Sequence, residues 1–249
     1  YPLFKPDFTI SNTCFETPSS IADKTTSTYG KTIFWDWIVN GQTFSNTKNV
    51  SYDKLLAGSY NIQLKVRDDK GCFDSISKQV TVYPKPNIKY TIPNPCQFEQ
   101  VQLECKSTVS APATIITNTW VLPNGTRINS CNTTTSFNTA GINNLKLIAL
   151  TDNGCADSMN IPITIFPKPV LNVTPNTKIC YDKNIQLNVT GAVNYTWTPN
   201  QFLSNDKISN PICSPNYPNS ITYEVKGIDA NGCSDSATTT ISFFTKPFI

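Results

Sequence analysis

The chain contains no histidine, a single methionine and few charges, with only 15% of its 249 residues being Asp, Glu, Lys or Arg. Without histidine, a Ser-His-Asp triad, a Cys-His dyad and a histidine general base are excluded. The carboxylates form no visible acid and base pair of the kind that a glycosidase needs. We therefore predict a protein that is not an enzyme, with no catalytic residues.

Long apolar runs and clusters of positive charge are also missing. No stretch of 18 apolar residues is present, so we expect no membrane insertion. The 20 basic residues include no adjacent pair and leave a net charge of +3, so nucleic acid is not an expected partner. No initiator Met, signal segment or targeting tail is visible, and we interpret the sequence as a piece of a longer protein.

What is abundant favours strands and turns. The chain is rich in Thr and Asn and has 18 prolines, and no window keeps an apolar period of 3.6 residues. Lys-Pro recurs at intervals of 80, 83 and 78 residues, at positions 5, 85, 168 and 246. Because proline ends a ladder and stiffens a junction, we predict three domains, 1–86, 87–169 and 170–249.

Each of these repeats carries the same landmarks in the same order. A tryptophan lies near the middle, and an alternating apolar strand follows it, as at Tyr60, Ile62, Leu64 and Val66. A Gly-Cys turn comes next, with cysteines at 72, 155 and 233. This order is typical of an Ig-like sandwich. We predict an all-β chain of three tandem Ig-like antiparallel β-sandwiches in an elongated array. Trp35, Trp120 and Trp197 are the predicted core tryptophans, while Trp37 is left open because it shares a face with Trp35.

The first repeat resembles a PKD domain, the Ig-like module named after the polycystic kidney disease protein. The resemblance rests on residues 35–41 (WDWIVNG) and 58–66 (GSYNIQLKV). The second repeat keeps Trp120 and the Asn-Gly at 124–125. The third is similar to Ig-like repeats found beside PKD units in Bacteroidota surface proteins, at residues 179–180, 195–199, 210–211, 222–225 and 231–233.

The resemblance implies an extracellular, cell-surface, repetitive protein exported by type IX secretion, such as the SprB-type gliding-motility adhesins. The expected function is then a structural and adhesive stalk module. Its expected partners are neighbouring repeats of the same chain, with a surface polysaccharide or another surface protein as further candidates. The alternative is a set of carbohydrate-binding modules that accompany a secreted polysaccharide-degrading enzyme.

Nine cysteines without a C-x-x-C motif indicate structural disulfides in an oxidising compartment. The simplest pairing lies within each repeat: Cys14–Cys72, Cys96–Cys155 with Cys105–Cys131, and Cys180–Cys233, leaving Cys213 free. A second pairing stays open, because the early cysteine and the Gly-Cys turn lie at opposite ends of a regular Ig sandwich. Neighbours would then be joined by Cys14–Cys155 and Cys96–Cys233, and Cys72 and Cys180 would await partners in missing repeats.

Two further groups of residues are candidate sites. Aspartates in turns could bind calcium, the one cofactor considered, at Asp68, Asp69, Asp152 and Asp229, although capping of the turn backbone is the simpler role. Asp-Ser-apolar triplets resemble the acceptor of Bacteroidota O-glycosylation. They make Ser75, Ser158 and Ser236 candidate glycosylation sites.

Overall fold

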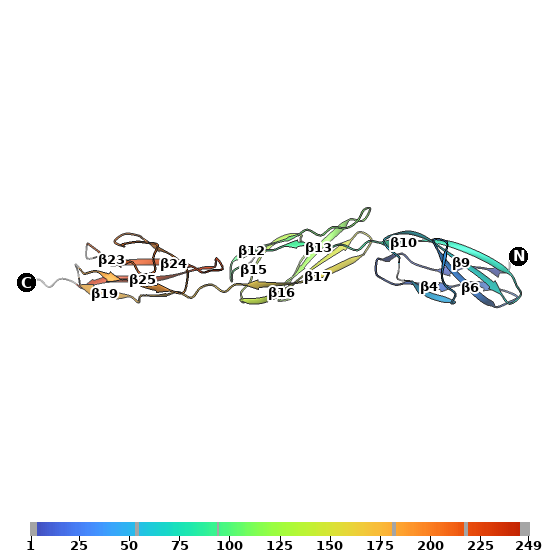
Figure 1. Cartoon of the computed structure of the whole chain (residues 1–249), viewed down its shortest axis with the longest axis horizontal. Helices are drawn as coiled ribbons and strands as arrows, with labels where there is room; N and C mark the ends of the chain where they lie inside the picture. Colours follow the sequence, from blue (N-terminus) through green and yellow to red (C-terminus); the bar gives the residue numbers. More distant parts are fainter. Residues whose placement is uncertain (1–3, 53–54, 94, 181–182, 217–218, 245–249) are drawn as a thin grey trace, which may run out of the picture. The chain divides into compact units, whose positions relative to one another are not determined.

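A computed structural model describes residues 4–52, 55–93, 95–180, 183–216 and 219–244. All regular structure in this part of the chain is β-strand. No helix long and apolar enough to cross a membrane occurs among these residues. The predicted all-β class is confirmed, and the strands lie in successive groups along the ribbon (Figure 1).

The first group of sheets uses residues 4–83. Its five-stranded sheet has the order β3 (Thr13–Cys14), β10 (Phe73–Tyr83), β9 (Gly58–Asp68), β6 (Thr32–Val39) and β7 (Gln42–Ser45). A three-stranded sheet contains β2 (Phe8–Thr9), β4 (Ser19–Asp23) and β8 (Asn49–Tyr52), and a short pair contains β1 (Phe4–Lys5) and β5 (Thr26–Ser27). These strands form the two faces of a sandwich.

The second group uses residues 90–165. One sheet has the order β11 (Tyr90–Thr91), β12 (Gln100–Cys105) and β15 (Asn132–Ser136). The other has the order β14 (Arg127–Ile128), β13 (Ile115–Val121), β16 (Gly141–Thr151) and β17 (Ala156–Ile165).

The third group uses residues 172–244. Its main sheet has the order β19 (Thr177–Cys180), β25 (Ser234–Phe244), β24 (Ile221–Ile228) and β22 (Asn194–Thr198). Two short pairs complete it, β18 (Asn172–Val173) with β21 (Val189–Thr190), and β20 (Ile185–Gln186) with β23 (Ile212–Cys213).

No sheet of the described residues takes strands from two of these groups. Packing nevertheless divides the chain into two compact units, 1–91 with 103–133 and 145–161, and 92–102 with 134–144 and 162–249. The middle group thus contributes to both units. The three domains 1–86, 87–169 and 170–249 therefore stay a prediction, and we use "repeat" below for the three sequence segments.

The long hairpin of the first repeat shows why the sequence folds this way. In β9, Ile62, Leu64 and Val66 are fully buried, while Asn61 and Lys65 are exposed. This period of two places one face of the strand in the core and the other in water. The strand pairs with β10 in continuous antiparallel register, from Phe73 opposite Arg67 to Val82 opposite Gly58. The alternation predicted for this strand is confirmed.

One tryptophan lies at the centre of each sandwich core. Trp37, Trp120 and Trp197 are at most 1% exposed. Each indole N–H donates to a main-chain carbonyl ten or eleven residues further on, at Thr47 (2.8 Å), Cys131 (3.0 Å) and Ile208 (2.9 Å). These carbonyls satisfy the single donor of each indole, as a buried tryptophan requires.

The prediction of Trp35 as the core tryptophan of the first repeat is only partly right, because Trp35 packs against the core without being buried in it. Trp35 and Trp37 lie on the same face of β6, opposite Val66 and Leu64 respectively. Trp35 is only half-buried, and its indole N–H donates to Asp23 at 3.0 Å. Trp37, one step further along the strand, has the central place instead.

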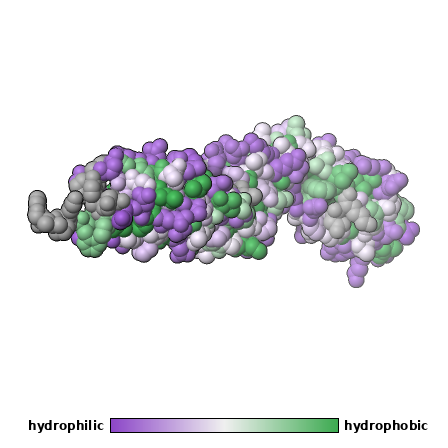
Figure 2. Space-filling view, turned by 60° about the vertical axis from the view of Figure 1, so that its left-hand side comes forward, coloured by the Kyte–Doolittle hydropathy of each residue, from purple (hydrophilic) through white to green (hydrophobic). Residues whose placement is uncertain are grey.

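The surface follows from the composition. Polar side chains cover much of the space-filling view, and apolar residues appear among them in small groups (Figure 2). Because the chain has few charges, this polar cover comes mainly from uncharged side chains.

Candidate functional site

The Gly-Cys turns of the first and third repeats are built alike. The Asp68 amide donates to the Cys72 carbonyl at 3.1 Å, and the Cys72 amide donates to Asp68 Oδ1 at 2.9 Å. Asp229 and Cys233 make the same two bonds at 2.9 and 2.8 Å. The glycine before each cysteine has a φ near +80°, which favours glycine because a Cβ would be strained there, at Gly71 (83°), Gly154 (79°) and Gly232 (84°).

The second repeat builds the same turn with a hydroxyl in place of the carboxylate. The Thr151 amide donates to the Cys155 carbonyl at 2.9 Å, and the Cys155 amide donates to Thr151 Oγ1 at 3.1 Å. A side-chain oxygen four residues before the cysteine therefore fixes the turn in every repeat. Each turn holds its cysteine at the end of a long hairpin, just before the last strand of the repeat begins.

The calcium candidates are already used as acceptors within these turns. Asp68 is 4% exposed and receives the amides of Lys70 and Cys72, and Asp69 receives the amide of Lys31 at 3.0 Å. Asp229 receives two turn amides in the same way. The described part of the chain brings together no group of three or more Asp, Glu, Cys or His residues for a metal ion. The structure thus shows capping by these carboxylates, and calcium binding stays a prediction.

Asp152 joins its turn to the loop before β13. Its carboxylate receives the amide and the hydroxyl of Thr114, at 3.2 and 3.1 Å. The hydrogen bond from the Thr114 amide lowers the pKa of Asp152 below its ordinary value, because it favours the charged form.

The early cysteine of each repeat lies at the other end of the last strand. Cys14, in β3, pairs in parallel with the final residue of β10, Tyr83. Cys180, in β19, pairs in parallel with the final residue of β25, Phe244. An isolated parallel bridge places Cys96 opposite Phe166, directly after β17. All three early cysteines therefore sit beside an aromatic residue where the last strand finishes.

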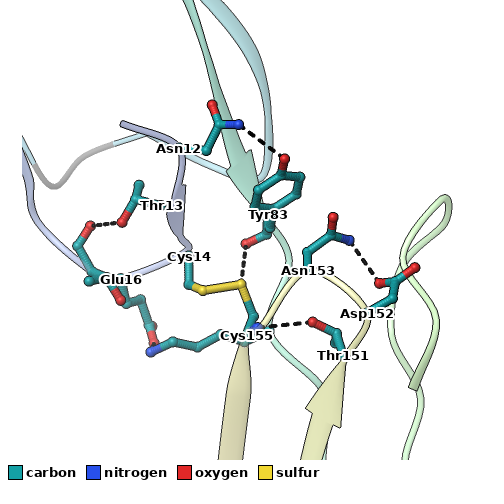
Figure 3. The surroundings of a disulfide bond; sticks show 11 residues. Asn12, Thr13, Cys14, Glu16, Tyr83, Thr151, Asp152, Asn153 and Cys155 are labelled. Carbon is teal, nitrogen blue, oxygen red and sulfur yellow. Dashed lines mark hydrogen bonds and ion pairs between the residues drawn. A yellow bond between two sulfur atoms is a disulfide. The ribbon is translucent and has the colours of Figure 1, made fainter. Parts of the chain in front are cut away.

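Two disulfides join the early cysteine of one repeat to the Gly-Cys turn of the next. Cys14 is bonded to Cys155 and Cys96 to Cys233, each with a Cα–Cα distance of 5.6 Å. Figure 3 shows the first of these bonds, with Tyr83 beside the sulfur of Cys155 and the Thr151 hydroxyl at its amide. Each bond lies within one of the two compact units, the first in that of residues 1–91 and the second in that of residues 162–249. We call these two bonds the staples.

The pairings Cys14–Cys72, Cys96–Cys155 and Cys180–Cys233 are wrong. The two cysteines of a repeat flank its last strand, and in the first repeat this strand, β10, is 11 residues long. At ~3.3 Å per residue the strand spans about 36 Å. A disulfide requires Cα atoms within about 7 Å, so the two cysteines of one repeat cannot reach each other.

The remaining cysteines behave as predicted. Cys105 and Cys131 form a bridge inside the second repeat, with a Cα–Cα distance of 5.0 Å. Cys213 is a buried free thiol beside the Tyr223 hydroxyl, at 3.3 Å. Burial raises the pKa of Cys213, and the thiol therefore stays protonated and unreactive at neutral pH. Cys72 and Cys180 are free as well, but both are exposed.

The three candidate glycosylation serines share one local geometry. Ser75, Ser158 and Ser236 are exposed, near the start of the last strand of each repeat. The aspartate before each serine accepts the serine amide, at 2.7, 2.7 and 3.0 Å. These sites are accessible and alike, and modification there stays a prediction.

A row of two exposed aromatic side chains with a half-buried arginine between them crosses the first repeat, a feature that the sequence reasoning missed. Phe34 lies opposite Arg67, and Arg67 lies opposite Phe73, on three adjacent strands. The guanidinium is 5.7 Å from the Phe34 ring centre and 5.5 Å from that of Phe73, within the range of cation–π attraction. Phe73 is 68% exposed and Phe34 is 37% exposed. We call these three residues the aromatic row.

No family model and no curated protein matches the chain. Among solved structures, the N-terminal eight Ig domains of Down syndrome cell adhesion molecule match 98% of this chain at 13% identity, with a TM-score of 0.50. The chain spans 37% of that structure. The likeness shows the fold, and the chain is a series of Ig-like β-sandwich repeats.

Two bacterial structures match parts of the chain. The PKD1 domain of the Vibrio cholerae metalloprotease PrtV matches 32% of this chain and 96% of its own length, at 25% identity and a TM-score of 0.29. The fibronectin(III)-like modules of Clostridium thermocellum CbhA match 65% of this chain and 95% of their own length, at 14% identity and a TM-score of 0.36.

Proposed function

We propose that the chain is a load-bearing spacer segment of an extracellular surface protein. The observation that supports this most directly is the pair of staples, each of which bonds one repeat to the next. A bond inside one sandwich stabilises only that sandwich, whereas a bond between consecutive repeats couples them mechanically. Three disulfides also fit an oxidising compartment, where such bonds persist.

The same proposal extends to the parent protein. A stalk that presents an adhesive tip, in a SprB-type gliding-motility adhesin exported by type IX secretion, would need many repeats of this build. The resemblance of residues 35–41 and 58–66 to PKD domains supports this narrower reading. Catalysis is not part of the proposed function, because the chain has no histidine.

A spacer works only if its repeats lie in line, and small-angle X-ray scattering tests this for the oxidised chain. Three sandwiches of about 40 Å in line form a rod with a radius of gyration of about 35 Å, from the rise of ~3.3 Å per strand residue. A single compact body of this length has about 18 Å. We expect the larger value, and a value near 18 Å would contradict the spacer.

The aromatic row favours a second candidate function, carbohydrate binding. Exposed aromatic rings can stack against sugar rings, and the half-buried Arg67 between them can donate hydrogen bonds to hydroxyl groups. If this function holds, the chain should bind a polysaccharide on a glycan array with saturable, sub-millimolar affinity. Phe73→Ala should then weaken binding at least tenfold, while exposed Phe98→Ala, on another repeat, should leave it unchanged. Absence of binding on a broad array would remove this candidate.

A further inference from the structure

We infer that Cys72 and Cys180 each take part in a third kind of staple. At each site, a further Ig-like repeat of the same build supplies the second cysteine. Cys72 would receive the early cysteine of one such repeat, and Cys180 would receive the Gly-Cys turn of another. Cys72 is a turn cysteine and Cys180 is an early cysteine, and each staple joins one of each kind. A second copy of this chain in head-to-tail order therefore supplies the partner. The inference rests on the proposed spacer function.

Cys72 has the same setting as the two turn cysteines that are bonded. Its amide and carbonyl make the hydrogen bonds that Cys233 makes, at distances within 0.2 Å (2.9 against 2.8 Å, and 3.1 against 2.9 Å). Cys155 differs only in receiving its cap from a threonine hydroxyl. Both bonded equivalents are fully buried, whereas Cys72 is exposed. The turn is therefore already built, and what is missing is the strand that would cover it.

Cys180 has the same surroundings as the two early cysteines that are bonded. It lies beside the last residue of β25, as Cys14 lies beside the last residue of β10. The neighbouring ring is Phe244 here and Tyr83 there, and Cys96 has Phe166. Both equivalents of Cys180 are bonded to a Gly-Cys turn of the following repeat, and neither is bonded to a cysteine of its own kind. This gives the third staple a definite polarity, from early cysteine to turn cysteine.

Closing the third staple is an oxidation of two thiols, for which glutathione disulfide can serve as the oxidant. The Cys180 thiolate attacks one sulfur of glutathione disulfide and releases one glutathione thiolate. The Cys72 thiolate of the partner then attacks the Cys180 sulfur of the mixed disulfide and releases the second glutathione. Two S–H bonds are lost and one protein S–S bond forms, while glutathione disulfide is reduced to two glutathione molecules.

Two copies of the full chain, joined end to end in one polypeptide, provide the test. In this fusion Cys180 of the first copy precedes Cys72 of the second by 141 residues, the same separation as between Cys14 and Cys155. The fusion is incubated with reduced and oxidised glutathione, alkylated without reduction, and analysed by peptide mapping. The matched control is the fusion with Cys180→Ser in the first copy only.

We expect one new bond, between Cys180 of the first copy and Cys72 of the second. Alkylation without reduction should then label Cys72 of the first copy and Cys180 of the second copy, but neither of the two inner cysteines, which are Cys180 of the first copy and Cys72 of the second. In the control, Cys72 of the second copy should be labelled. Full labelling of both inner cysteines, or bonds that join Cys72 to Cys72 or Cys180 to Cys180, would overturn the inference. Such a result would leave the spacer intact if the scattering of the single chain still shows a rod, so the two failures are distinguishable.

Discussion

Pulled by its two ends, the oxidised chain is expected to reach only about a quarter of the extension of the reduced chain. The staples and the Cys105–Cys131 bridge offer a short covalent route through the molecule. From the N-terminus the route follows residues 1–14, crosses to Cys155 and runs back along the chain to residue 131. It then crosses to Cys105, runs back to residue 96, crosses to Cys233 and ends at residue 249. At ~3.6 Å per extended residue, it measures about 240 Å with its three bridges, against about 900 Å for the whole chain.

Single-molecule force spectroscopy checks this with handles at the termini, before and after reduction. Residues 15–95, 106–130 and 156–232 lie outside the route, so the load never unravels them while the disulfides are intact. The physical reason is covalent and does not depend on the stability of any sandwich. An oxidised chain that extends beyond about 350 Å would show that the staples are absent.

Two variants make the test specific for the observed pairing. Removing the central bridge by Cys105→Ser with Cys131→Ser should lengthen the route to about 330 Å, because the load must then follow residues 96–155. Under pairing within each repeat, a Cys96–Cys155 bond would bypass the central bridge and the same variant would change nothing. Replacing Cys72 and Cys180 by serine, which breaks no disulfide of the chain, should leave the extension unaltered.

A stalk with this disulfide connectivity has a fixed maximum length under load. In an array without staples, each sandwich that unfolds adds its full contour length, and the spacing of the tip domain is lost. Here, the load passes from Cys14 to Cys155 and from Cys96 to Cys233, so the β9–β10 hairpin of the first repeat and the strands β17 and β24 of the other two repeats are spared. This property would suit a surface protein that experiences drag, which is the setting proposed above.

The sandwiches were predictable from the sequence, because their signals are local. The alternation at Ile62, Leu64 and Val66 and the glycine of each Gly-Cys turn depend only on near neighbours along the chain. Even the objection to pairing within a repeat came from the regular Ig sandwich, in which the early cysteine and the Gly-Cys turn lie at opposite ends. What the sequence could not decide is which sulfur meets which, because that depends on how one repeat is placed beside the next.

The choice between Trp35 and Trp37 failed for a different reason. Both side chains point to the same face, so periodicity could not separate them. The spacing to the following turn does not separate them either: Trp35 and Trp37 precede the Asn-Gly at 40–41 by five and three residues, and Trp120 precedes that at 124–125 by four. What Trp37 and Trp120 share is a contact of the folded chain, the bond from the indole to a carbonyl ten or eleven residues further on.

The core tryptophans should show the largest stability effects of any single residue in the chain. Trp37→Ala is expected to lower the free energy of unfolding of the first repeat by about 3–5 kcal/mol, because it opens a large cavity under Phe8 and Leu64. It also leaves the Thr47 carbonyl without its indole donor. Trp37→Phe keeps much of the ring volume, and should cost about 1–3 kcal/mol through that carbonyl alone.

Hydrogen exchange monitored by mass spectrometry is the suitable measurement, because it resolves stability within one multi-domain chain. We expect protection of the β6, β9 and β10 amides to fall by two orders of magnitude or more in Trp37→Ala, at about 1.4 kcal/mol per factor of ten. The third repeat should keep its protection. Trp35→Ala is the matched control: its side chain is half-buried and its indole reaches only Asp23, so the loss should be clearly smaller. If Trp35→Ala lowered protection as much as Trp37→Ala, the central place of Trp37 in the core would be contradicted.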